Sequence, residues 1–278
     1  MNVGVVGLGL IGGSLAKSFK RYTTHNILGM DIDHVVVAAA ELLGVVDEEL
    51  TFENLDMCDI VIMATYPRTT VEFLENNASR IKKGAKVIDC GGVKRNVCEK
   101  CFEIADKNGF IFVGGHPMAG TQFTGFKYSV ENMFDDASII LVPSRTDDID
   151  FLVEIKKMFL DIGFASVTIS KAEEHDEIIA FTSQLAHVVS NAYVKSPNAK
   201  RHEHFSAGSY KDLTRVAKLN ENMWAELFID NGDNLSNEIE SLINELTKYN
   251  DAIKNKDFDT LKILLKQGRE LKEQIDGV

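Results

Sequence analysis

NVGVVGLGLIG, residues 2–12, is the stretch from which the fold of this chain can be predicted. Residues 2–6 form a short apolar run typical of a strand that is buried on both faces. Three glycines follow at the spacing G-x-G-x-x-G, just before a helical pattern begins. Gly7 suits a tight turn, Gly9 lets the backbone approach a pyrophosphate, and Gly12 lets the helix pack closely on the strand. This arrangement predicts a dinucleotide-binding unit whose helix N-terminus receives the diphosphate.

The same alternation of strand and helix patterns continues to residue 169. Short apolar runs predict strands at residues 2–6, 25–30, 60–64, 86–89, 110–114, 138–142 and 165–169. The segments between them predict helices at residues 11–20, 33–43, 69–80, 94–107 and 148–162. This order of elements predicts an α/β fold with a doubly wound, mostly parallel, Rossmann-type sheet.

The pattern changes near Ser170, after which only helices are predicted. They cover residues 172–193, 210–219, 223–245 with interruptions, and 257–275. We therefore expect two domains, a dinucleotide-binding domain at residues 1–169 and an all-helical domain at residues 170–278. The last helix has an apolar stripe, which predicts that the helical domain forms a homodimer. The stripe consists of Leu261, Leu264, Leu265, Leu271 and Ile275.

Composition excludes several classes of protein. The 278 residues include 30 Lys and Arg and 42 Asp and Glu, so the net charge is −12, which argues against general nucleic-acid binding. The sequence has no apolar run of membrane-spanning length and no leader-like start at Met1, so we expect neither membrane insertion nor export. Cys98 and Cys101 lack the second pair that a zinc site needs, and His202-Glu203-His204 lies in a polar loop without further ligands. We expect no metal, and a protein of the reducing cytoplasm.

The second predicted strand ends at Asp31, 19 residues after Gly12. A carboxylate at this position binds both ribose hydroxyls of NAD and repels the 2′-phosphate of NADP, so NAD is the predicted cofactor. Turns after the third and fourth long strands lie at the same edge of the sheet, where ligands bind in open α/β folds. The predicted cofactor-binding residues are Gly7, Gly9, Leu10, Ile11, Gly12, Asp31, Thr65, Tyr66, Pro67 and Val93.

Three polar residues are candidates for substrate chemistry. His116 follows a predicted strand at the edge where the nicotinamide should lie, although an ordinary loop histidine is the alternative. Arg215 lies among apolar residues, which suggests either a guanidinium held for a carboxylate or a structural salt bridge. His187 lies in the middle of a predicted helix, where a satisfied core histidine is the default interpretation.

Several ordered motifs resemble those of the prephenate dehydrogenase family, which includes the arogenate dehydrogenases. Residues 115–121, GHPMAGT, resemble its H-P-[IM]-A-G-[TS] signature. His175-Asp176 and the later SQLAH at residues 183–187 resemble its H-D…S-H-L-P-H helix. KDLTRVA at residues 211–217, followed by Trp224, resembles a third motif. The resemblance extends over essentially the whole chain.

The resemblance implies an NAD-dependent oxidative decarboxylation of prephenate to 4-hydroxyphenylpyruvate, in tyrosine biosynthesis. His116 would be the catalytic histidine that hydrogen-bonds the ring hydroxyl, Arg215 would bind the ring carboxylate, and His187 would face the substrate side chain. It also implies a homodimer with intertwined helical domains. The expected substrate-binding residues are His187, Arg215, Gly208, Thr121 and Gln122.

The sequence departs from the family pattern at four positions. Gly92 replaces a frequent Ser, Gln122 a frequent Glu, Gln184 a His and Ala186 a Pro. These changes bear on substrate preference more than on reaction type.

Three other functions are alternatives to the oxidation of prephenate. The nearest is an arogenate dehydrogenase that forms tyrosine directly. A β-hydroxyacid dehydrogenase is expected to use a helix Lys with an Asn one turn on, whereas this chain offers His187 and Asn191. A non-enzymic NAD-binding regulator would bind the cofactor without turnover.

Overall fold

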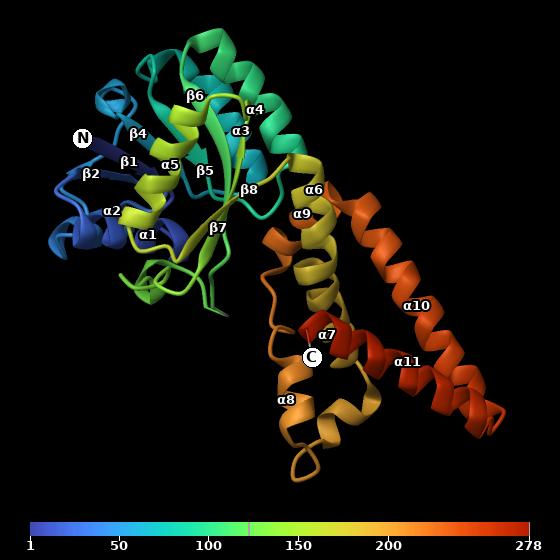
Figure 1. The fold of residues 1–278 in the computed structure, drawn as a ribbon. Helices are drawn as coiled ribbons and strands as arrows, with labels where there is room; N and C mark the ends of the chain where they lie inside the picture. Colours follow the sequence, from blue (N-terminus) through green and yellow to red (C-terminus); the bar gives the residue numbers. More distant parts are fainter. Residues whose placement is uncertain (122, 278) are drawn as a thin grey trace.

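The structure is a computed structural model that describes residues 1–121 and 123–277. Within these residues eight strands form one sheet in the order β3-β2-β1-β4-β5-β6-β7-β8 (Figure 1). All neighbouring strands pair in parallel except β6 and β7. The strands are β1 (Asn2–Val6), β2 (Asn26–Met30), β3 (Glu48–Glu49), β4 (Ile60–Met63), β5 (Lys86–Asp89), β6 (Ile111–Pro117), β7 (Ser138–Pro143) and β8 (Ser166–Ile169). The predicted fold class is confirmed.

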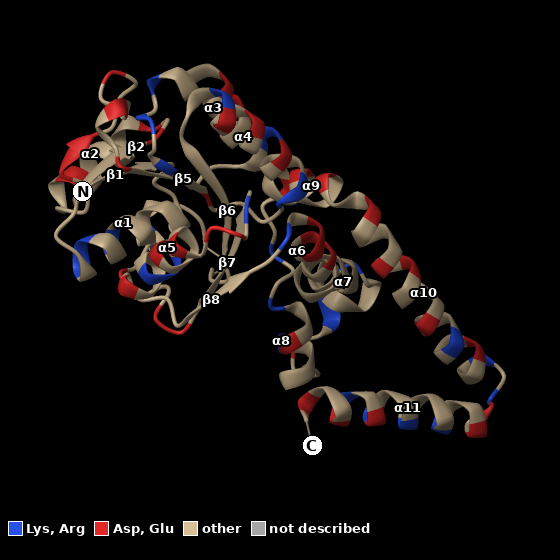
Figure 2. Ribbon diagram, turned by 45° about the horizontal axis from the view of Figure 1, so that its top comes forward, with Lys and Arg blue, Asp and Glu red and all other residues tan. Residues whose placement is uncertain are grey.

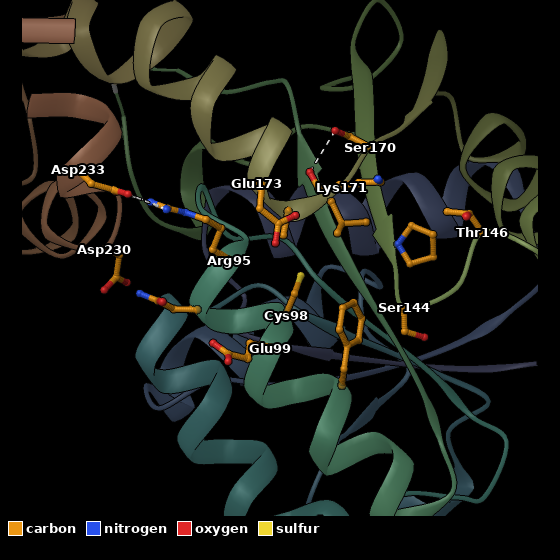
Figure 3. A pocket seen from close by; sticks show the side chains of 15 residues that line it. Arg95, Cys98, Glu99, Ser144, Thr146, Ser170, Lys171, Glu173, Asp230 and Asp233 are labelled. Carbon is orange, nitrogen blue, oxygen red and sulfur yellow. Dashed lines mark hydrogen bonds and ion pairs between the residues drawn. The ribbon is translucent and has the colours of Figure 1, made fainter. Parts of the chain in front are cut away.

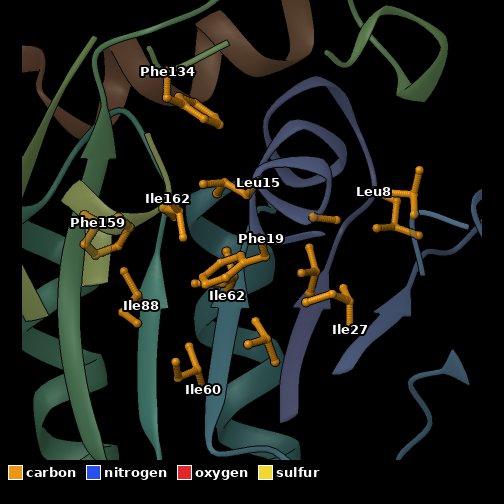
Figure 4. Packing of buried hydrophobic residues seen from close by; sticks show 14 of the residues in the cluster. Leu8, Leu15, Phe19, Ile27, Ile60, Ile62, Ile88, Phe134, Phe159 and Ile162 are labelled. Atoms are coloured by element: carbon orange, nitrogen blue, oxygen red, sulfur yellow. The ribbon is translucent and has the colours of Figure 1, made fainter. Parts of the chain in front are cut away.

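Helices cover both faces of this sheet. They are α1 (Leu10–Tyr22), α2 (His34–Leu42), α3 (Pro67–Asn77), α4 (Arg95–Asn108) and α5 (Ile149–Asp161). One face packs against α1, α2 and α5, where Leu15, Phe19 and Phe159 meet the inner side chains of the strands (Figure 4). The other face packs against α3 and α4 around residues such as Leu74 and Val97. Two filled cores thus hold the strand ends in fixed positions.

Two strands differ from the prediction. The two-residue β3 was not predicted, because both of its glutamates are exposed and show no apolar pattern. The prediction that the strand of residues 110–114 ends before His116 was wrong. β6 continues to Pro117 because residues 114–117 pair with the antiparallel β7, which places His116 opposite Ile140 within the sheet.

The rest of the chain is helical from α6 (Ala172–Ile179) onward. A π-helical turn at Ala180–Leu185 joins α6 to α7 (Ala186–Tyr193), so the predicted helix 172–193 is continuous with a local change of winding. The later helices are α8 (Gly208–Thr214), α9 (Glu221–Asp230), α10 (Gly232–Lys254) and α11 (Phe258–Asp276). Shorter 3₁₀ turns lie at Leu55–Met57, Ala78–Arg80, Phe126–Tyr128 and Pro197–Arg201.

The helix that was predicted at residues 210–219 has different bounds in the structure, where it is α8. α8 begins at Gly208 and ends at Thr214, because Ala217 turns back to the Thr214 carbonyl. The Asn191 side chain then donates to the Ala217 carbonyl at 3.1 Å, which holds the turn against α7. Arg215 therefore lies at the end of a helix rather than within one.

α10 and α11 form a hairpin that projects away from the sheet (Figure 1). The charged residues of α10 are mainly acidic, whereas acidic and basic residues are mixed along α11 (Figure 2), with pairs such as Lys266–Glu270 spaced one turn apart. α11 contains no buried residue within the described part of the chain. None of the described helices has the length and apolar character needed to cross a membrane. The boundary between residues 169 and 170 stays a prediction.

Candidate active site

The glycine turn lies between β1 and α1, next to the carboxyl end of β4. Gly7 has a φ of +90°, and a Cβ there would lie 2.6 Å from the Ala64 carbonyl oxygen. At Gly12 a Cβ would lie 1.9 Å from the Gly7 carbonyl oxygen, so only glycine allows this packing. Gly9 precedes α1 and has open space where its Cβ would be. The turn therefore leaves a surface on which a phosphate group can approach the first amides of α1.

Asp31 directly follows β2 beside this turn. Its carboxylate accepts a hydrogen bond from the Leu8 amide at 2.8 Å and another from the Asp33 amide at 3.0 Å. Each carboxylate oxygen can accept more than one bond, so these contacts orient the group and leave acceptor capacity for ribose hydroxyls. Leu10 and Ile11 form the first turn of α1.

The other predicted cofactor residues follow β4 and β5 at the same edge of the sheet. Thr65 and Tyr66 lead into α3, and Pro67 occupies its first turn. Val93 is buried just before α4. The neighbouring Gly92 lies against Leu227 of α9, whose methyl groups would be 3.4 Å from an added Cβ. A helix of the C-terminal part thus packs directly on the turn where the family frequently has Ser.

A buried ion pair supports the backbone next to His116. Lys94 is fully buried and its Nζ lies 2.5 Å from the Asp89 carboxylate. Asp89 also accepts hydrogen bonds from the Gly91 and Gly115 amides, both at 2.9 Å. The Asp89 carboxylate thus links β5 to the turn that follows it and to β6 through three hydrogen bonds. A charge pair without solvent contact is stable only when it is hydrogen-bonded in this way.

His116 contacts a residue pair from the helical part of the chain. Its Nδ1 lies 2.9 Å from Nε2 of His175, a residue in the first turn of α6. The Nδ1 of His175 in turn lies 2.7 Å from the Asp176 carboxylate. The same carboxylate accepts bonds from the Lys94 amide at 2.7 Å and the Arg95 amide at 2.9 Å, at the start of α4.

The environment favours neutral histidines and an ionised carboxylate. Burial lowers the pKa of His116 well below its usual value, and repulsion from a protonated His175 and from Lys94 acts in the same direction. Burial also lowers the pKa of His175, against the opposing effect of its hydrogen bond to Asp176. Burial raises the pKa of Asp176, but hydrogen bonds from His175 and Arg95 outweigh this effect and hold it below the ordinary value. His116 is therefore able to accept a proton at neutral pH.

His187 lies on the same continuous helix as His175, about 18 Å further along its axis at 1.5 Å per residue. Its ring stacks on Trp224 with a centroid separation of 3.9 Å. Its Nδ1 lies 2.8 Å from the Ser183 carbonyl oxygen. Burial lowers the pKa of His187, and the charge of Arg215 lowers it further, so the exposed guanidinium is near this imidazole.

The remaining predicted substrate residues lie on the surface. Gly208 opens α8 and is exposed. Thr121 is exposed and its Oγ1 accepts a hydrogen bond from the Phe123 amide at 3.2 Å. Gln122 lies outside the described residues. No hydrogen bond joins Gly208 or Thr121 to His116 within the described part of the chain, so their roles stay predictions.

Sequence reasoning missed a network of polar side chains that joins the start of α4, the π-helical turn after α6 and the junction of α9 with α10. Gln184 is buried and donates to the Leu227 carbonyl at 3.0 Å, while its oxygen accepts from Asn231 at 2.8 Å. Asn231 also donates to the Asp176 carbonyl at 2.7 Å, and Arg95 bonds to both Asn231 and Asp233. In the sequence the signal for this network was the His175-Asp176 dipeptide within the predicted helix 172–193. Gln184 thus joins helices.

A cavity lies beside this joint. It has a volume of about 810 Å³ and is lined by α4, the segment after β7 and the starts of α6 and α10 (Figure 3). Arg95 and Asp233 meet on its wall, where Asp230 also lies. Neither His116 nor the glycine turn contributes to its described lining. The cavity therefore borders Arg95 and the start of α6 rather than the predicted cofactor surface.

The described residues contain no group of three or more His, Cys, Asp and Glu side chains arranged to hold a metal ion. Cys98 and Cys101 lie on the buried face of α4. Burial raises the pKa of the Cys101 thiol to about 12, so it stays protonated at neutral pH.

Comparisons with known proteins agree with this arrangement. Residues 15–168 match the family model "Prephenate dehydrogenase, nucleotide-binding domain", and residues 171–267 match "Prephenate dehydrogenase, dimerization domain". A prephenate dehydrogenase of Bacillus subtilis is 28% identical over 278 residues, which cover 97% of this chain and 74% of that protein.

Two solved structures are similar over nearly the full length. A prephenate dehydrogenase from A. aeolicus, in complex with hydroxyphenyl propionate and NAD+, has a TM-score of 0.85 and 30% identity, covering 99% of this chain and 98% of that chain. Synechocystis arogenate dehydrogenase has a TM-score of 0.81 and 25% identity, covering 99% of this chain and 100% of that one.

Proposed function

The chain belongs to the prephenate dehydrogenase family, and on that premise we propose that it oxidises prephenate with NAD. The products are 4-hydroxyphenylpyruvate, CO2 and NADH, which places the enzyme in tyrosine biosynthesis. Removal of hydride from the ring carbon that bears the hydroxyl creates a ketone conjugated with the ring. This ketone accepts the electrons released as CO2 leaves, and aromatisation makes the step irreversible.

The residues around the glycine turn fit a dinucleotide. The open surface at Gly9 and the first amides of α1 suit the diphosphate, and the oriented carboxylate of Asp31 suits the ribose hydroxyls. NAD, when bound, supplies the acceptor for the hydride. Thr65, Tyr66, Pro67 and Val93 line the turns that continue this edge towards His116.

The observation that carries the proposal is the position of His116. It lies at the carboxyl edge of the sheet and in direct contact with the helical part, and its lowered pKa leaves it neutral. A neutral imidazole accepts the proton of the ring hydroxyl, a contribution of about 10²–10⁴-fold in rate for a general base. Arg215 holds the ring carboxylate until decarboxylation, and His187 on its Trp224 platform faces the side chain.

One contact favours arogenate as a second candidate. The Ser183 carbonyl can only accept, so His187 Nδ1 carries the hydrogen and its Nε2 is an acceptor while the ring is neutral. An acceptor suits the ammonium group of arogenate better than the keto group of prephenate. In that case the enzyme forms tyrosine directly.

The proposed assembly is a homodimer in the cytoplasm. The match to a dimerization domain and the absence of buried residues on the described part of α11 support pairing through the helical region. All four cysteines are free thiols, as expected in a reducing compartment. Gel filtration with light scattering tests the dimer, and cell fractionation tests the location.

Incubation of the purified enzyme with NAD and either prephenate or arogenate tests the proposed function. We expect NADH to form together with 4-hydroxyphenylpyruvate from prephenate, and higher kcat/KM for prephenate than for arogenate. Tyrosine as the faster-formed product would favour the second candidate. NADH formation from neither substrate would contradict the proposal, and faster turnover with NADP would contradict the role of Asp31.

A further inference from the structure

We propose that His175 and Asp176 are positioning residues that hold His116 in the one neutral tautomer able to take a proton from substrate. This inference rests on the proposed function, because it assigns a partner to the proposed base. Neither residue needs to touch substrate or cofactor. Their effect passes through the hydrogen bond between the two imidazoles, whose ring centroids are 5.1 Å apart.

The positions of the hydrogens on both imidazoles follow from the Asp176 carboxylate, which ends the series of hydrogen bonds from His116 through His175. An ionised Asp176 can only accept, so the nitrogen at 2.7 Å, Nδ1 of His175, carries a hydrogen. In a neutral imidazole the other nitrogen is then an acceptor, which makes Nε2 of His175 the acceptor of the 2.9 Å bond. His116 must donate through Nδ1, and its own Nε2 is left with a free electron pair.

Asp176 is held too firmly to rotate away from this role. One carboxylate oxygen receives the Lys94 amide and His175, and the other receives the Arg95 amide and guanidinium. The carboxylate is buried, and it lies at the N-terminus of α4, where a negative charge is favoured by the helix dipole. An acceptor with so many donors stays ionised and keeps the direction of every bond in the chain.

The proton step is balanced within this unit. The O–H bond of the ring hydroxyl breaks, an N–H bond forms at Nε2 of His116, and the Nδ1 hydrogen stays in its bond to His175. The positive charge that forms on His116 faces Lys94, which is paired with Asp89, and is balanced through His175 by Asp176. Arg95 does not cancel this balance, because Asp233 supplies its own carboxylate.

The series of hydrogen bonds from His116 to Asp176 also joins the sheet-containing region to the helical region. His116 belongs to β6, whereas His175 and Asp176 belong to α6, and the amides that hold Asp176 belong to the start of α4. The base therefore reaches its working tautomer only when α6 is docked on α4. Asn231 strengthens this docking through its bond to the Asp176 carbonyl.

Nitrogen NMR of protein labelled with ¹⁵N-histidine tests the tautomer directly, without substrate and at neutral pH. We expect the hydrogen of His116 on Nδ1 and that of His175 on Nδ1 as well. The His116→Ala variant assigns the signal. A wild-type His116 with its hydrogen on Nε2 would overturn the inference, whichever substrate the enzyme uses.

Kinetics of two His175 variants test its consequence. His175→Leu removes the acceptor of the His116 hydrogen. We expect kcat to fall by about 10²-fold, at the lower end of what a general base contributes. The KM values for NAD and for prephenate should stay within threefold of the wild type. His175→Gln offers an amide oxygen in place of Nε2, so it should recover at least a tenth of the wild-type kcat. His25→Leu, at a partly buried histidine on the opposite edge of the sheet, is the matched control.

A purely structural role predicts different results. It predicts a lower melting temperature with unchanged kcat per folded molecule and no change in the His116 tautomer. A folded His175→Leu enzyme that binds NAD and keeps kcat within threefold of the wild type would overturn the inference. If that variant does not fold, the wild-type NMR spectrum and the His175→Gln kinetics decide. Turnover by the wild type is a separate result, so failure of the proposed function is recognised independently.

Discussion

The sheet-containing region and the helical region of this protein hold their site residues in different ways. In the first, two filled cores fix the strand ends, and His116, Asp31 and the glycine turn are held by backbone pairing and short buried bonds. In the second, the buried apolar residues are few, namely Ile179, Ala180, Leu185, Leu227, Leu235 and Ala252 among the described residues. Arg215 lies there on an exposed helix end, and Ile275 of α11 is 78% exposed.

This difference indicates a division of labour. Groups that take part in the chemistry need positions within a fraction of an ångström, and a closed core supplies them. A helix such as α11, without a buried residue, is marginal by itself in water and gains stability only from packing. We therefore expect substitutions in the sheet region to affect kcat, and substitutions in the helical region to affect substrate affinity and assembly.

The largest effect is expected for His116→Ala. Loss of the base should lower kcat by about 10²–10⁴-fold, while the dissociation constant for NAD stays within threefold, because the glycine turn is untouched. Steady-state kinetics and a cofactor titration measure both quantities. His34→Ala, at an exposed histidine, is the control. A kcat within threefold of the wild type would remove His116 from the proposed mechanism.

The next effect is expected for Arg215→Ala in the helical region. A charge-assisted bond to the substrate carboxylate is worth about 1.5–3 kcal/mol, so KM should rise roughly 10- to 150-fold with little change in kcat. Arg215→Lys keeps the charge but not the planar pair of donors, so its KM should lie between those of the wild type and Arg215→Ala. Arg201→Ala, at the exposed end of the 3₁₀ turn before α8, controls for loss of a positive charge in the same region. A change confined to kcat would contradict the assignment.

A smaller effect on turnover, with a clear effect on assembly, is expected for paired substitutions on α11. Leu271→Asp with Ile275→Asp places charges on its exposed apolar positions and should convert a dimer of 30.9 kDa chains into monomers. NAD binding by the sheet region should persist. Gln267→Asp with Gln274→Asp adds the same charge at polar positions and should remain dimeric. Light scattering distinguishes the two, and a dimeric Leu271/Ile275 variant would exclude α11 from the interface.

The smallest effect is expected from pH. The folded pKa values of His116 and His175 lie below the ordinary value of about 6.5, so the unfolded chain takes up protons first as the pH falls. Stability from these two groups is complete above pH 6.5 and is lost below it, by at most about 1.4 kcal/mol per pH unit for each histidine. Urea unfolding between pH 7.5 and 5.5 measures this loss. The acid limb of kcat should likewise lie below pH 6.5, and a limb above it would contradict the lowered pKa.

Much of the fold could be predicted because the patterns are local. The glycine spacing at residues 7–12, the apolar strands and the helical stripes each depend on neighbours within a few residues. The misplaced end of β6 has a different origin, since residues 114–117 extend only because β7 pairs with them. The end of α8 is similar, because Asn191 of α7 holds the Ala217 turn.

The candidate site was predictable to the same degree. Residues that act through the local backbone, such as Gly7, Gly12 and Asp31, could be placed from the sequence. The partner of His116 could not, because His175 is 59 positions away and no local pattern links two such residues. Gln184 was interpreted as a change that bears on substrate preference, whereas its side chain is buried among helices.

By itself the sequence determined a parallel sheet, a cofactor turn and a family of reactions, because strand, turn and helix preferences are decided by near neighbours along the chain. Only the tertiary structure decided which nitrogen of His116 lies against His175 and that α11, among the described helices, is left without a buried residue. Those properties depend on contacts between distant segments, where burial and the direction of each hydrogen bond are set by packing.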